Sequence, residues 1–79
     1  MIGALVIQGL YFPPGSSRAL PARIESCEGR LKLHVDGEDG PRTPEVASIS
    51  QAIGHVPRKL VFRDGGAFEA PHDAPIEAL

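Results

Sequence analysis

Proline and glycine interrupt this chain at short intervals, which limits the length of its regular elements. The 79 residues include eight prolines and nine glycines, spread along the whole length. Proline removes a backbone donor and glycine relaxes turns, so their clusters end regular elements. Between the clusters, apolar and polar side chains alternate with a period of two, which is typical of half-buried strands.

This alternation predicts six strands. The first has apolar residues on both faces, so we expect it to be central or covered on both sides. We expect Glu28-Gly29 and Asp64-Gly65 to form hairpin turns. The fourth strand should bury Ala47 and Ile49, and the fifth should bury alternate residues that include Leu60. The predicted strands are residues 5–12, 20–27, 31–36, 45–51, 59–63 and 67–70.

The remaining segments are a polar loop and a C-terminal helix. Residues 36–44 offer no apolar surface to bury, so we expect an exposed and mobile loop. Asp73 can cap a short helix that tolerates Pro75 in its first turn and begins its apolar stripe at Ile76. The fold class is therefore all-β and mainly antiparallel: a small six-stranded barrel or sandwich with a short C-terminal helix. A pleckstrin-homology or GRAM-like barrel is one such form.

Size and charge restrict the classes of function. A single domain of this length buries roughly 60% of its unfolded surface, and Cys27 is the only cysteine, which excludes a disulfide within the chain. A lone thiol fits a reducing compartment or a packed small residue. The net charge of −2 gives no electrostatic footprint for nucleic acid or an anionic membrane. The apolar segment 2–10 is too short for a spanning helix and lacks a basic start.

No catalytic, metal or cofactor site is predicted. The spacings between His34, His55 and His72 match no metal motif, although separated residues can still meet in space. No serine lies in a G-x-S-x-G pattern. Glu38 and Asp39 belong to the polar loop, a solvated setting that does not favour acid catalysis by paired carboxylates.

Four segments together resemble one known family. They are Gly9-Leu10-Tyr11-Phe12 with the following Gly15-Ser16-Ser17, the hairpin 28–33, the segment 53–62 (IGHVPRKLVF) and the last strand 64–71 (DGGAFEAP). The chain resembles the N-terminal soluble domain of uncharacterised function fused to bacterial membrane-anchored zinc metallopeptidases of the HtpX-like, CAAX-protease-like type. The resemblance extends over nearly the whole of residues 1–79.

The resemblance implies a role for the chain in a longer protein. Residues 1–79 would be a non-catalytic accessory domain on the cytoplasmic side, tethered to the inner membrane only through the parent protein. It would regulate the metallopeptidase or present substrates to it, with the protease domain or its protein substrate as partner. The family's zinc ligands map onto no residue here. The expected interaction surface is the turn and basic strand edge formed by Gly54, His55, Pro57, Arg58, Lys59 and Arg63.

Other interpretations of the same residues remain open. Gly54 and Pro57 can simply shape a turn, and Arg58, Lys59 and Arg63 can be solvated strand charges or a weak phosphate patch. The alternative function is an independent small β-barrel that binds a peptide strand, a lipid headgroup or nucleic acid, since sheet edges often bind peptides by strand addition. A free-standing enzyme is the third hypothesis.

Overall fold

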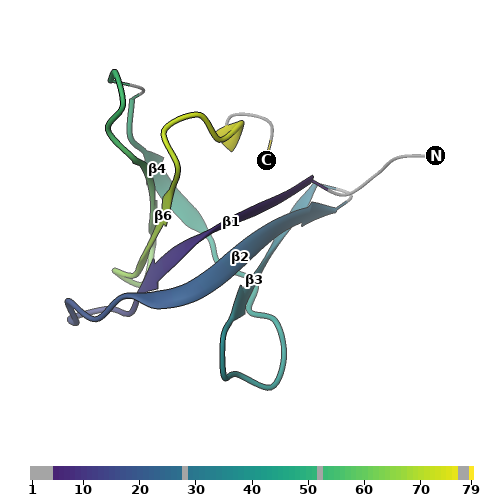
Figure 1. Cartoon of the computed structure of the whole chain (residues 1–79). Coiled ribbons are helices and arrows are strands. Elements are labelled where there is room, and N and C mark those ends of the chain that lie inside the picture. Colours follow the sequence, from purple (N-terminus) through teal and green to yellow (C-terminus); the bar gives the residue numbers. More distant parts are fainter. Residues whose placement is uncertain (1–4, 28, 52, 77–78) are drawn as a thin grey trace.

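The computed structural model describes residues 5–27, 29–51, 53–76 and 79, without the side chain of Cys27. All six predicted strands are present in one sheet (Figure 1). The expectations for Glu28 in the hairpin turn and for the Cys27 thiol concern parts of the chain that the structure does not describe. The strands are Leu5–Phe12 (β1), Leu20–Cys27 (β2), Arg30–Val35 (β3), Val46–Ile49 (β4), Arg58–Phe62 (β5) and Ala67–Ala70 (β6).

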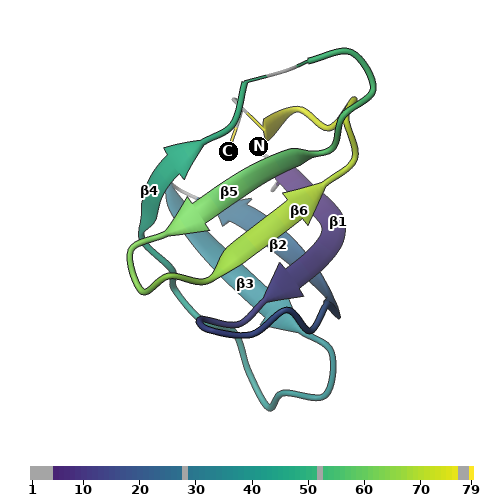
Figure 2. The same ribbon diagram turned by 90° about the vertical axis from the view of Figure 1, so that its left-hand side faces the viewer.

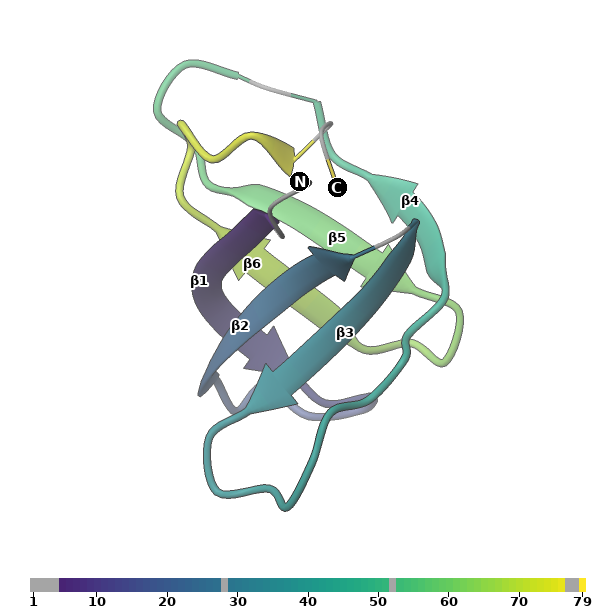
Figure 3. The ribbon, with the colours of Figure 1, turned by 90° about the vertical axis from the view of Figure 1, so that its right-hand side faces the viewer.

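The sheet is antiparallel throughout and curls into a half-barrel. Its strand order is β3-β2-β1-β6-β5-β4, so β3 and β4 are the two edges. Figures 2 and 3 show how the curl brings the β4–β5–β6 half to face the β1–β2–β3 half. The all-β class and antiparallel pairing are thus confirmed, with a barrel that stays open between its edges.

Strand β1 joins the two halves of the sheet, because it pairs with β2 on one side and with β6 on the other. Its residues pair with β2 from Leu5 to Tyr11 and with β6 from Leu10 to Phe12. At Gly9 the two halves approach so closely that a Cβ atom would lie 2.2 Å from the backbone oxygen of Glu69. A glycine inside a strand often marks such a close approach of another backbone. Gly9 therefore permits the curl.

The core lies inside the curl and follows the predicted alternation. On β2, β3 and β5 the apolar side chains at every second position point inward, as expected. Tyr11 and Phe68 are the largest fully buried side chains. The buried apolar residues are Ile7, Tyr11, Ile24, Leu33, Val35, Leu60, Phe62, Phe68, Ala70 and Ile76.

The central position expected for β1 is confirmed, whereas the burial expected on β4 was wrong. β1 lies inside the strand order, with Val6 46% and Leu10 37% exposed on its outer face. On β4, Ala47 and Ile49 are exposed instead of buried. The pairing of β4 with β5 shifts register between Val46 and Ser48. Such a bulge breaks the period-two alternation at Ala47. Ile49 pairs with the inward-facing Leu60 and is exposed because β4 is an uncovered edge.

The expected C-terminal helix was also wrong for the residues described. Residues 72–74 form a turn in which the Ala74 N–H donates to the Pro71 carbonyl at 3.0 Å. Ile76 has 3₁₀ conformation and is 1% exposed. An isolated helix of one or two turns is marginal, and burial of Ile76 in the core determines the path of this segment instead. Residues 77–78 lie outside the description.

Gly9→Ala is expected to destabilise the fold by about 2–3 kcal/mol, because the new methyl group would overlap a backbone oxygen that cannot move alone. Urea denaturation followed by circular dichroism measures the change. The control is Gln8→Ala, the exposed neighbour in β1, which should alter stability by less than about 0.5 kcal/mol. Equal stabilities for the two variants would contradict the close approach at Gly9.

Candidate functional site

A groove opens where the half-barrel fails to close. It has a volume of about 610 Å³ and runs between the edge strands β3 and β4, and we call it the seam groove. Figure 3 looks at the side of the molecule on which these two edges lie. The groove is lined by Gly29, Arg30, Leu31, Thr43, Pro44, Val46, Ile49, Leu60, Ile76 and Leu79.

The lining of the seam groove is largely apolar. Leu60 and Ile76 are buried core residues, so the groove reaches the core of the domain. Ile49 lies on the β4 wall and is 45% exposed. Arg30 is the one charged residue among the lining residues described. An open apolar groove of this kind offers a contact surface for apolar side chains.

The β3 wall also presents backbone groups. Leu33 exchanges two backbone hydrogen bonds of 2.8 Å with Arg42 on the side away from β2. In an antiparallel strand, residues two apart direct their backbone groups to the same side. The N–H and C=O of Leu31 therefore point outward at the groove, where no backbone group of the described residues pairs with them. This part of β3 is an open sheet edge.

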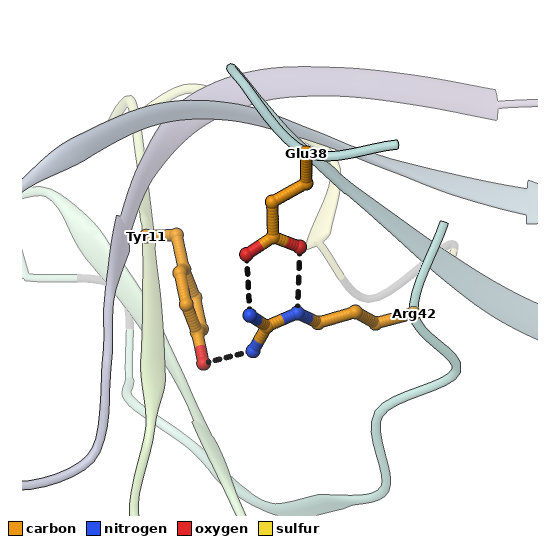
Figure 4. A network of polar contacts seen from close by, with 3 residues as sticks. All are labelled: Tyr11, Glu38 and Arg42. Carbon is orange, nitrogen blue, oxygen red and sulfur yellow. Dashed lines mark hydrogen bonds and ion pairs between the residues drawn. The ribbon is translucent and has the colours of Figure 1, made fainter. Parts of the chain in front are cut away.

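The loop after β3 is anchored by Arg42 (Figure 4). The Arg42 Nε donates to Glu38 Oε1 at 2.8 Å and its Nη2 donates to Glu38 Oε2, while its Nη1 donates to the Tyr11 hydroxyl at 3.0 Å. The hydrogen bond to Glu38 raises the pKa of Arg42. The loop is exposed, as predicted, but this network ties it to the core. Thr43 and Pro44, which directly follow Arg42, are thereby positioned on the groove lining.

The interaction surface expected from sequence is only partly assembled. Gly54, His55, Pro57, Lys59 and Arg63 are exposed. Arg58 is 6% exposed and lies on the inner face of β5. Its Nε and Nη2 donate to the Ser50 carbonyl at 3.2 and 2.8 Å. The guanidinium of Arg58 therefore anchors the chain after β4, which corrects the expectation that it contributes to an exposed basic edge.

The other two cations of that surface are held on the outer face of the sheet. Lys59 Nζ lies 5.9 Å from the centre of the Phe12 ring. Arg63 Nε is 3.4 Å from Glu45 Oε2, in a pair that is more than two-thirds exposed. Because Arg58 points inward, the three cations do not form the single phosphate patch considered from sequence.

The three histidines occupy two different places. His34 Nε2 is buried without a hydrogen-bond partner, 3.6 Å from Glu25 Oε1, beside an outer cavity of about 410 Å³. His55 and His72, far apart in sequence, meet with Nδ1 and Nε2 3.2 Å apart. Within the described part of the chain, no three His, Cys, Asp or Glu side chains gather to hold a metal ion.

Sequence reasoning missed both the seam groove and the Arg42 network. The groove depends on the open edges of a curled sheet, which no local motif reports. Tyr11 lies in an apolar strand, but nothing in the sequence predicts which cation reaches its hydroxyl.

The chain belongs to a family of domains of unknown function, DUF7092, whose model matches residues 6–79. No curated protein matches the chain, and no solved structure matches it. None of the helical segments described has the length and apolar character needed to cross a membrane.

Tyr11→Phe and Arg42→Met are expected to be coupled by about 0.5–1.5 kcal/mol, the range of a protein hydrogen bond. Urea denaturation of the two single variants and the double variant measures this coupling. Arg18→Met, at an exposed arginine before β2, is the control and should combine additively with Tyr11→Phe. Additive effects of Tyr11→Phe and Arg42→Met would contradict the network.

Proposed function

We propose that this chain is a non-catalytic protein-interaction domain that binds an extended polypeptide segment in the seam groove. The observation that carries the proposal is the open seam itself: two sheet edges flank an apolar groove that reaches core residues. An extended segment could add as a strand at Leu31 of β3 and place alternate side chains against Ile49 and Leu60. Strand addition obtains affinity from main-chain hydrogen bonds and specificity from pockets for alternate side chains.

The groove's chemistry favours a polypeptide over the other ligands considered. Nucleic acid and anionic lipid headgroups require several cations, whereas Arg30 is the one cation of the described lining. A peptide uses both the apolar walls and the backbone groups of β3. Arg30 at the rim adds a preference for a segment with an acidic residue or a terminal carboxylate at one end.

The resemblance to the N-terminal domain of membrane-anchored zinc metallopeptidases supplies the biological setting of the proposal. In that setting the seam groove would hold unfolded protein substrate and present it to a protease domain, or bind a segment of the parent protein and regulate it. An extended segment is the form in which proteases accept substrates, so one groove serves either role. The parent protein would then be tethered to the inner membrane with this domain on the cytoplasmic side.

Peptide binding can be measured with a fluorescein-labelled octapeptide selected from a random library on the purified chain. We expect saturable binding in the micromolar range, with amide shifts in NMR spectra at residues 29–31 and 46–49. Ile49→Asp should weaken binding at least about tenfold, because it places a charge against the apolar wall. A copy of the peptide with alternate amides N-methylated should also bind less, because it cannot form the ladder.

The matched control is Val61→Asp. Val61 is a similarly exposed apolar residue on the outer face of β5, and its substitution should change affinity less than about twofold. Absence of binding at about 1 mM peptide, or shifts confined to the outer face of β5 and β6, would refute the seam groove as the binding site.

The accessory role is tested separately by the mass and membrane partitioning of the native polypeptide in its own cells. We expect a product several times larger than this chain in the membrane fraction, with a peptide containing HExxH detected by mass spectrometry. A soluble species of 8.4 kDa would overturn the accessory role and leave peptide binding as an independent function.

A further inference from the structure

We propose that His55 and His72 form a binding site for one divalent transition-metal ion, with Zn²⁺ as the representative ion. The two side chains belong to separate segments at one end of the sheet. His55 Nδ1 and His72 Nε2 lie 3.2 Å apart, and the ring planes are inclined by 78°. The site does not depend on the function proposed for the seam groove.

The separation of the two nitrogens suits two ligands of a single ion. Zinc binds imidazole nitrogen at 2.0–2.1 Å with tetrahedral geometry, which places two ligand nitrogens about 3.3 Å apart. Zinc, copper and nickel all favour imidazole. Both histidine side chains are exposed, so an ion can enter without rearrangement of the core.

The fold brings the two segments together before any ion binds. Arg58 pairs with Ala70 in the β5–β6 ladder, and the two histidines lie just outside this last pair. The turn that holds His55 is closed by a 2.9 Å bond from the Val56 N–H to the Ile53 carbonyl. The turn that holds His72 is closed by the Ala74 bond to Pro71. This preorganisation reduces the entropy lost when both imidazoles bind one ion.

Metal binding to the two imidazoles would change the tautomer of one ring. In the hydrogen-bonded pair, one ring must carry its proton on the nitrogen that faces the other ring. In the metal-bound pair, both facing nitrogens are ligands, so that proton moves to the outer nitrogen of the same ring. Because no third protein ligand gathers among the described residues, water or a carboxylate from a partner would complete the coordination. We therefore expect an open, exchangeable site.

Isothermal titration of the tag-free chain with ZnCl₂ tests the site. We expect one ion per chain, and at least about a tenfold loss of affinity in His55→Gln and in His72→Gln, because each removes one of two ligands. His34→Gln is the matched control, since His34 lies on β3 away from the pair, and it should keep the affinity of the unaltered chain.

Imidazole ¹⁵N spectra of the unaltered chain give a second measurement that needs no variant. Saturating Zn²⁺ should shift His55 Nδ1 and His72 Nε2 and leave both nitrogens of His34 in place. Saturation should also raise the melting temperature, since the ion binds the folded state preferentially. No saturable binding below about 1 mM Zn²⁺, unchanged affinity in either single variant, or shifts at other residues would overturn the proposal.

Discussion

The contact between β1 and β6 at Gly9 is the constraint on which the rest of the structure depends. A small sheet without covering helices buries its core by curling. Here one strand pairs with β2 over most of its length and with β6 at its end. A side chain at Gly9 would collide with the backbone of Glu69. With glycine there, the inner residues of both halves meet around Tyr11 and Phe68.

The same curl determines where the domain can interact. Because β3 and β4 do not pair, the barrel keeps two edges, and open edges tend to recruit other strands unless they are covered. The chain covers part of the β3 edge itself, through the backbone pairing of Arg42 with Leu33. The Glu38 and Tyr11 contacts of Arg42 hold that cover in place. The uncovered remainder of the β3 edge, around Leu31, lines the seam groove together with Ile49 of β4.

The surroundings of Arg58 and of the His55–His72 pair depend on this arrangement of strands. Arg58 belongs to a basic sequence, yet it is turned into the fold and holds the carbonyl of Ser50. His55 and His72 are 17 positions apart, yet the β5–β6 ladder places their rings side by side. Membership of the DUF7092 family assigns a function to none of these residues. The proposals therefore depend on the geometry of the groove and of the histidine pair.

Local pattern was sufficient to predict most of the fold. Strand alternation and turn residues located all six strands, the antiparallel class and the inward faces of β2, β3 and β5, because these depend on neighbours in sequence. The pattern failed at β4, where a bulge exposes Ala47 and the open edge exposes Ile49, and after Pro71, where burial of Ile76 replaces a helix among the described residues. Tertiary structure alone decided which strands became edges, and hence the seam groove, the inward turn of Arg58 and the meeting of His55 with His72. These features are set by contacts between residues distant in the chain, which the periodicity of a single segment does not encode.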